Sequence, residues 1–242
     1  MENIIPSQEG KERLSQAPTL RDTLIDTTFN PHRAIDPQIK KIDLAAFQED
    51  VDMLRGLIVP GSQIEHGKLY YVTTKKTLLK PNKEISGTES EIMFHSRVRG
   101  GYREIQGEKV FIQDRFVGTT THTHPSGYPF SPQDLYDLFL DDEIHFAETA
   151  ASVVTTNQTM VLFRGNNTPE WEDNFTREKV KRWDAMVRAR IQENLRPRMS
   201  QEEIVAINAR AQSAFLRQAI QTYDLQLFTC GVNESILVKA SA

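Results

Sequence analysis

A run of strand-like segments set between helical stretches constrains the fold of this 242-residue chain most. Leu69–Thr74 is rich in aromatic and β-branched residues, and Glu91–Val98 and Lys109–Val117 follow after glycine-containing breaks. These residue types favour pleated strands. Residues 151–156 and 159–164 predict a further strand pair around a polar turn. We therefore expect an α/β protein with a mixed central β-sheet.

Helical patterns precede and interrupt these strands. From Asp43 to Ile58, apolar residues recur at three- and four-residue steps, which predicts an amphipathic helix that ends before Pro60. Ser131 begins a shorter helix through about Asp141. Residues 1–37 are polar and punctuated by proline, with mostly isolated apolar side chains. We expect them to form an N-terminal arm that contributes little to the core.

The remaining sequence predicts a core of residues 38–165 followed by a helical extension over residues 166–242, packed on that core. Thr168-Pro169 is a typical helix start, with a capping threonine and proline at the first helical position. Ser200–Glu203 is a capping-box pattern that begins a second helix, expected to reach about Tyr223. Two short apolar segments, Leu225–Thr229 and Ser235–Lys239, predict a closing hairpin.

Composition excludes several kinds of protein. The single Cys230 rules out a disulfide framework and a zinc site built from several thiolates. A metal site would therefore use His, Asp and Glu, and the chain has 6 His. The formal net charge of -4 argues against nucleic acid as a partner. No apolar run approaches the ~20 residues of a membrane helix, and the polar N-terminus lacks a secretory signal, so we expect a cytoplasmic protein without a membrane partner.

The most informative residues lie between 118 and 135. His122 and His124 are two residues apart at the end of a predicted strand, so both imidazoles point to one face. Two imidazoles on one face are half of a zinc site. Asp134 follows across a Pro/Gly-containing loop, and as a third ligand it would leave the fourth position to water, the arrangement of catalytic sites. With Ser131, however, Asp134 also makes a good helix start, and that role alone could explain it.

This combination resembles the JAB/MPN metalloprotease family, also called JAMM, and is similar to its bacterial RadC-like branches. The family pattern is His-Ser/Thr-His-Pro, a short loop and Ser-x-x-Asp, with a glutamate well upstream. The loop here is one residue shorter than that pattern. The resemblance implies a cytidine-deaminase-like architecture, Zn2+ bound by two histidines and an aspartate, and a serine that supports the oxyanion. The matching residues are His122, Thr123, His124, Pro125, Ser131 and Asp134.

The same resemblance implies a glutamate that handles the proton of the attacking water. Glu65 lies 57 residues before His122, after the first predicted core helix and where a strand opens, as the family's glutamate does. We therefore predict Glu65 as the general base. Glu84, Glu89 and Glu91 remain alternatives.

The function expected from this resemblance is a zinc-dependent metallopeptidase or isopeptidase. Its substrate would be a peptide or protein, with a peptide bond or a ubiquitin-like isopeptide amide cleaved by a metal-activated water. Two alternatives stay open. One is a JAB/MPN-like scaffold without catalysis. The other is a PHP-type metallophosphoesterase, although its further metal ligands are scarce here, since His145 is the only histidine after Asp134.

Overall fold

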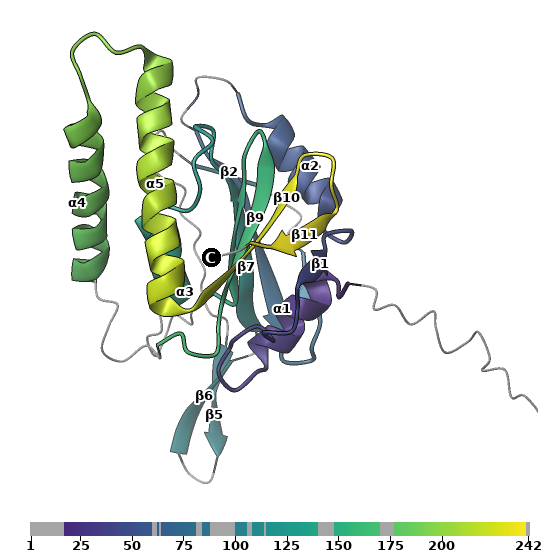
Figure 1. Cartoon of the computed structure of the whole chain (residues 1–242). Coiled ribbons are helices and arrows are strands. Elements are labelled where there is room, and N and C mark those ends of the chain that lie inside the picture. The colour runs from purple at the N-terminus through teal and green to yellow at the C-terminus, as the bar shows by residue number, and fades with distance from the viewer. Residues whose placement is uncertain are drawn as a thin grey trace, which may run out of the picture.

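A curled, mixed β-sheet forms the centre of the molecule in the computed structural model (Figure 1). The structure describes residues 17–59, 62, 64–80, 84–87, 100–105, 108–113, 115–139, 148–169 and 177–240. In chain order the elements are α1 (Leu20–Thr28), β1 (Lys41–Asp43), α2 (Gln48–Gly56), β2 (His66–Thr73), β3 (Leu78–Leu79), β4 (Ile85–Ser86), β5 (Gly100–Ile105), β6 (Glu108–Gln113), β7 (Arg115–Thr123), α3 (Pro132–Phe139), β8 (Ala150–Val154), β9 (Gln158–Arg164), α4 (Arg177–Asn194), α5 (Gln201–Tyr223), β10 (Leu225–Gly231) and β11 (Ile236–Lys239).

The strand order of the central sheet is β1-β11-β10-β9-β8-β7-β2-β3, with β4 paired to β2. Strands β7 and β8 are parallel, and the other pairs are antiparallel. Strands β5 and β6 form a separate hairpin that extends away from the sheet (Figure 1). The sheet is therefore mixed, which confirms the predicted α/β class.

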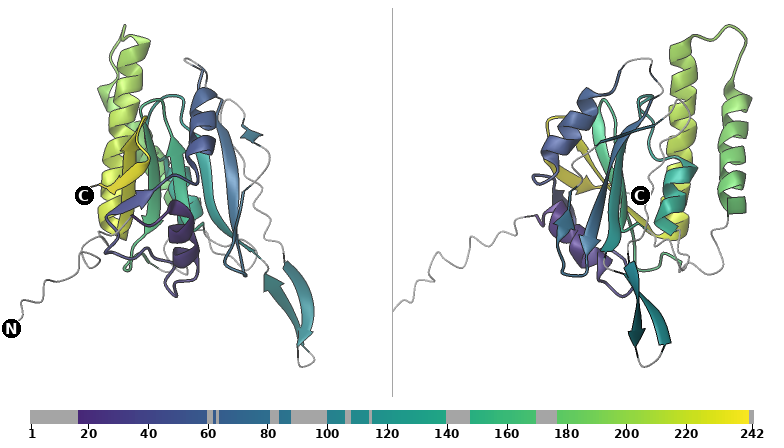
Figure 2. Two further views of the ribbon diagram at one scale, coloured as in Figure 1. Left: turned by 90° about the vertical axis from the view of Figure 1, so that its right-hand side faces the viewer. Right: turned by 180° about the vertical axis from the view of Figure 1, so that it is seen from behind.

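Helices cover both faces of the sheet, with α1 and α2 on one side and α3, α4 and α5 on the other (Figure 2). Because side chains alternate along a strand, β9 serves both layers. Val161 and Phe163 pack with the cluster around α1, whereas Met160 and Leu162 pack with α3, α4 and α5. Residues 160–163 of this strand are buried on both faces, so they appear in the sequence as a continuous apolar run.

The prediction that residues 1–37 contribute little to the core is wrong for helix α1, which packs in the core. Leu20, Leu24 and Ile25 are buried in the same cluster as strand residues of the central sheet. Part of the face of α1 consists of buried threonines, which made the segment look polar. Thr28 can be buried because its hydroxyl donates to the Leu24 carbonyl at 2.7 Å and contacts the Thr149 hydroxyl at 2.7 Å. Residues 1–16 of the predicted arm lie outside the described residues.

The other predicted elements occur with shifted boundaries. Helix α2 begins at Gln48 rather than near Asp43, because residues 41–43 pair with β11 instead. Helix α5 begins at the predicted capping box, in which Ser200 and Glu203 bond each other reciprocally. The predicted strand over residues 91–98 lies outside the described residues. Among the described helices, none combines the length and the apolar character needed to cross a membrane.

Candidate metal centre

His122 and His124 lie side by side at the end of β7, facing the layer of α3. The two-residue spacing points both rings to the same face, and their Nε2 atoms are 3.1 Å apart. His122 pairs with Val153 of the neighbouring parallel strand, and His124 donates its backbone N–H to the Val154 carbonyl at 2.9 Å. The histidines are 3% and 2% exposed, respectively. The sheet thus presents two buried imidazole nitrogens toward one point.

Asp134 reaches this point from the first turn of α3. One carboxylate oxygen, Oδ1, is 3.0 Å from His122 Nε2, and the other, Oδ2, is 3.5 Å from His124 Nε2. Asp134 also has the capping role that the sequence left open. Its Oδ2 accepts the Ser131 N–H at 2.6 Å, while its own N–H donates to Ser131 Oγ at 3.3 Å. Asp134 therefore caps the helix and faces both histidines.

Glu65 completes the group from a distant part of the chain. Strands β2 and β7 are antiparallel with Gly67 opposite His122, so Glu65, two residues before Gly67, comes beside the end of β7. His66 donates its backbone N–H to Thr123 Oγ1 at 2.9 Å, which holds the start of β2 in this place. Glu65 Oε1 is 3.7 Å from His124 Nε2. Ligand atoms of Glu65, His122 and His124 all lie within 4.8 Å of one another.

The alternative acids and histidines are not brought to this group. Glu84 lies against His66, with Oε1 at 2.6 Å from the Nδ1 atom, and also accepts a hydrogen bond from Ser86. Its carboxylate is thus engaged at the edge of β2. Glu89, Glu91 and His145 lie outside the described residues. Of the four glutamates named from the sequence, Glu65 is the one that the described structure places beside the histidines.

The loop after β7 supplies a feature that sequence reasoning missed. His124 Nδ1 lies 3.0 Å from the carbonyl oxygen of Tyr128 and 3.1 Å from that of Pro129. A carbonyl can only accept, so Nδ1 carries the hydrogen and Nε2 presents its lone pair toward the neighbouring carboxylates. The short loop is closed by a turn in which Gly127, at φ 73°, donates its N–H to the His124 carbonyl at 2.9 Å. Backbone acceptors of this kind leave no residue-type signal in a sequence.

The donor set fits a metal ion. Two ligand atoms that each lie ~2.0–2.2 Å from one zinc ion, at a tetrahedral angle, are about 3.3–3.6 Å apart. The separations of 3.1, 3.0 and 3.5 Å among the nitrogens of His122 and His124 and the oxygens of Asp134 are close to this range. Nitrogen and carboxylate oxygen are also ligands that zinc accepts. The side chains are therefore already grouped as metal binding would require.

No family model, curated protein or solved structure matches this chain. The evidence for the centre is therefore its own geometry. Ligand atoms of Glu65, His122 and His124 lie close enough to share an ion, and Asp134 adds a carboxylate whose oxygens lie 3.0 and 3.5 Å from the two histidines. Because Glu65 and the two histidines lie far apart in the sequence, local sequence proximity alone does not explain the group.

Burial and charge perturb the pKa of each member of the centre. Burial raises the pKa of Glu65 to about 7. Burial would lower the pKa of His122, but the carboxylates of Asp134 and Glu65 outweigh it and raise the pKa to about 9. Burial lowers the pKa of His124. The pKa of Asp134 is lowered, because the two histidines outweigh the effect of its burial. Such opposed shifts in a small group are typical of functional sites.

Proposed function

We propose that the protein is a zinc-dependent metallopeptidase of the JAB/MPN type, which hydrolyses a peptide bond or a ubiquitin-like isopeptide amide. The proposal rests on one observation: Glu65 lies beside the group formed by His122, His124 and Asp134. Three potential ligands alone would support a metal site of any purpose. An additional half-buried carboxylate, 3.7 Å from the Nε2 atom of His124, supplies the general base that amide hydrolysis needs.

His122, His124 and Asp134 would hold the ion. Zinc supplies Lewis acidity and lowers the pKa of a coordinated water from 15.7 to about 7. The protein's own part is to orient the ligands. The carbonyls of Tyr128 and Pro129 hold the ring of His124, and the hydrogen bond from the Ser131 N–H holds the carboxylate of Asp134.

Glu65 and Ser131 would act on the substrate. Glu65 takes a proton from the attacking water and returns it to the leaving amine nitrogen. Ser131 Oγ accepts the Asp134 N–H, so the hydroxyl hydrogen can still be donated to the oxygen of the substrate carbonyl as charge develops there. Loss of one such donor typically reduces the rate by ~10²–10³.

The position of Glu65 favours this proposal over the scaffold alternative. A scaffold that needs no chemistry does not require a half-buried carboxylate at this point, because partial burial of an acid costs free energy. The phosphoesterase alternative gains no further support, because the one histidine after Asp134 in the sequence is His145.

The proposal is tested by comparing two glutamate variants in zinc-loaded protein. Zinc content is measured by elemental analysis, and hydrolysis is followed with internally quenched peptides and with a ubiquitin-like isopeptide substrate. We expect Glu65→Gln to retain zinc and lose hydrolysis. Glu84→Gln is the matched control, since Glu84 lies at the edge of β2 against His66, and it should keep both.

Histidine variants test the metal site itself. His122→Ala and His124→Ala should lose the zinc, whereas His66→Ala should retain it. Stoichiometric zinc in both of the first two variants would disprove the site. Full hydrolysis by Glu65→Gln would remove Glu65 from the mechanism, and an inactive but zinc-binding parent protein would favour the scaffold.

A further inference from the structure

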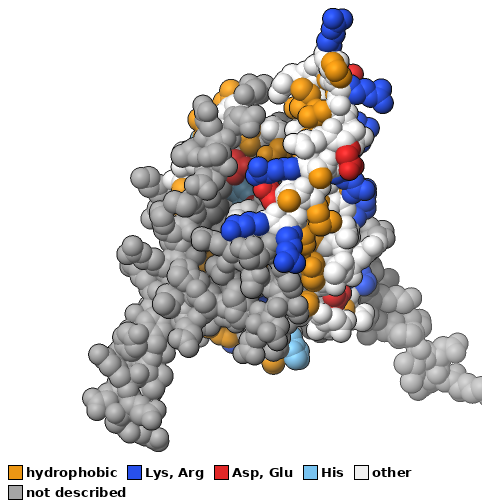
Figure 3. Space-filling view, turned by 90° about the vertical axis from the view of Figure 1, so that its left-hand side faces the viewer, with side chains coloured by type: hydrophobic (Ala, Val, Ile, Leu, Met, Phe, Trp, Pro, Cys, Tyr) orange, Lys and Arg blue, Asp and Glu red, His pale blue; other side chains and the backbone are white. Residues whose placement is uncertain are grey.

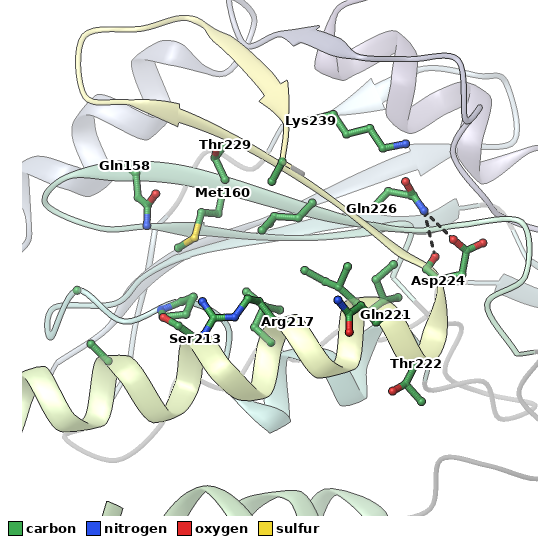
Figure 4. Close-up of a pocket in the computed structure, with 18 of the residues that line it drawn as sticks. Gln158, Met160, Ser213, Arg217, Gln221, Thr222, Asp224, Gln226, Thr229 and Lys239 are labelled. Carbon is green, nitrogen blue, oxygen red and sulfur yellow. Dashed lines mark hydrogen bonds between the residues drawn. The ribbon is translucent and has the colours of Figure 1, made fainter. Parts of the chain in front are cut away.

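A cavity of about 740 Å³ lies between helix α5 and the β9–β10 part of the sheet (Figure 4). Ser213, Leu216 and Arg217 line it from the helix, and Met160 and Leu227 line it from the strands. A helix that covers a sheet normally packs closely against it. Helix α5 does pack on the sheet through Phe215, Leu216 and Ala219, but beside this contact a cavity remains whose volume is within the range of ligand sites, ~300–1,000 Å³.

The lining combines apolar side chains with amides and hydroxyls. Gln158, Gln221 and Gln226 contribute amide groups, and Ser213 and Thr229 contribute hydroxyls. Amides and hydroxyls can both donate and accept hydrogen bonds, as the backbone of an extended peptide requires. Apolar walls with interspersed polar groups therefore suit a peptide segment better than a purely apolar ligand.

Arg217 and Lys239 are the basic side chains of the cavity lining. The close-up shows the Arg217 side chain in the space between α5 and the strands (Figure 4). The carboxylate in the lining, Asp224, accepts hydrogen bonds from neutral donors, namely Asn167 N, Asn167 Nδ2 and Gln226 Nε2 at 2.8, 3.2 and 2.8 Å. Among the described residues Arg217 has no ion-pair partner, so its guanidinium is available for an anionic group of a ligand.

Helix α5, which lines the cavity, and its neighbour α4 together carry a positive charge. Residues 177–223, which span α4 and α5, contain ten Lys and Arg against five Asp and Glu, a charge of +5 in a chain of net charge -4. The other residues therefore carry -9. Lys and Arg side chains gather along these two helices in the space-filling view (Figure 3). A positive region on a negative protein attracts acidic partners and steers their approach.

The cavity and the metal centre lie on two sides of one loop. Gly127 and Pro129 line the cavity, while the Pro129 carbonyl oxygen lies 3.1 Å from His124 Nδ1. A ligand in the cavity is thus separated from a metal-ligating histidine by a single stretch of backbone. This position suits a segment of the substrate that docks beside the reacting bond.

We propose that the cavity between α5 and β9–β10 docks an extended, acidic peptide segment of the substrate, with a carboxylate of that segment bound by Arg217. The inference rests on the proposed peptidase function, and it adds the class of substrate. Apolar side chains of the segment lie against Met160, Leu216 and Leu227, and its backbone bonds the amides and hydroxyls of the lining.

Docking is measured separately from hydrolysis. Zinc-loaded Glu65→Gln protein is immobilised and incubated with a library of short peptides of randomised sequence, and the bound peptides are sequenced. We expect enrichment of Asp and Glu at one position by about fivefold over the input, as one partly desolvated ion pair would give. Adding Arg217→Glu should reverse the preference at that position toward Lys and Arg.

Two further variants make the test specific. Arg210→Glu, in the same Glu65→Gln background, changes the charge of α5 equally but lies outside the cavity lining, so the acidic preference should persist. Ser213→Trp should fill the cavity and abolish peptide enrichment while zinc content is retained. Far-ultraviolet circular dichroism and zinc content confirm that each variant is folded.

The possible results distinguish docking from catalysis. Absence of acidic enrichment, equal loss of it in Arg210→Glu and Arg217→Glu, or its persistence in Arg217→Glu would overturn the inference. If the parent protein hydrolyses peptides but shows no such enrichment, the result supports the proposed peptidase function and contradicts peptide docking in the cavity. If enrichment depends on Arg217 but the parent protein hydrolyses no peptide, the result supports peptide docking in the cavity and contradicts the proposed peptidase function.

Discussion

Ser131 and Asp134 hydrogen-bond each other in both directions at the start of α3. The Ser131 N–H donates to Asp134 Oδ2 at 2.6 Å, and the Asp134 N–H donates to Ser131 Oγ at 3.3 Å. The same carboxylate faces His122 through Oδ1 at 3.0 Å. One local capping interaction therefore fixes the direction of the acid at the candidate metal centre, and it links the stability of a helix end to the geometry of the site.

Replacing Asp134 by Asn separates these two roles. The asparagine oxygen can still accept the Ser131 N–H, but the substitution removes the negative charge that the two histidines favour, so the metal-free protein should unfold at a lower urea concentration. The neutral amide of asparagine is a poor ligand, and the zinc affinity should fall by more than about 100-fold. Competition with a fluorescent chelator measures the affinity. Unchanged zinc affinity would show that Asp134 only caps the helix.

Replacing Ser131 by Ala tests the other partner. Loss of the capping hydroxyl should lower the free energy of unfolding of metal-free protein by about 1 kcal/mol, measured by urea denaturation. The Ser131 backbone N–H remains, so the Asp134 carboxylate keeps one of its hydrogen bonds and zinc should still bind. Hydrolysis should decrease ~10²–10³-fold if the hydroxyl also stabilises the oxyanion. Full activity would remove that role.

Leu24→Ala tests whether α1 belongs to the core. The Leu24 side chain is completely buried, so truncation should cost about 2–5 kcal/mol of unfolding free energy. Arg21→Ala on the exposed face of the same helix is the control and should change stability by less than about 0.5 kcal/mol. Equal, small effects of the two substitutions would support the sequence-based picture of an arm outside the core.

Asp50 links α2 to the sheet through charge. Its carboxylate lies 2.5 Å from Lys68 Nζ and 3.4 Å from Lys80 Nζ. Burial alone would raise the pKa of Asp50, but the hydrogen bond and charge of Lys68, together with Lys80, lower it. The folded state therefore binds this proton less readily than the unfolded state. The resulting stability is present above the unfolded pKa, near 3.8, and is lost as the pH falls through the lower folded value.

Asp50→Asn should accordingly reduce the unfolding free energy at pH 7 by about 1.5–3 kcal/mol and flatten its decline below about pH 4. Urea unfolding of metal-free protein across these pH values measures both effects. Asp52→Asn, on the exposed side of α2, is the control and should leave the slope nearly unchanged. A parallel decline for the parent and Asp50→Asn would contradict the linkage.

Much of the fold was predictable because its signals are local. The capping box at Ser200 and Glu203 places the start of α5, and the polar turn between β8 and β9 marks a hairpin. The prediction that residues 1–37 contribute little to the core was wrong for α1. Threonine is a polar residue type, but Thr23, Thr27 and Thr28 are buried in this helix. Their environment depends on what packs against the helix, which a local pattern does not contain.

The candidate site likewise combines features that local sequence predicts with features that depend on the tertiary structure. By itself the sequence determined that His122 and His124 share a face, because side-chain direction alternates along a strand, and that Asp134 stands in the first turn of a helix. Only the tertiary structure decided which glutamate joins them. The antiparallel register of β2 with β7 brings Glu65 to His124, which lies 59 positions later in the sequence, while Glu84 pairs with His66. The register in which two strands pair depends on which of their side chains the packed sheet buries, and residues far apart in the sequence determine that packing.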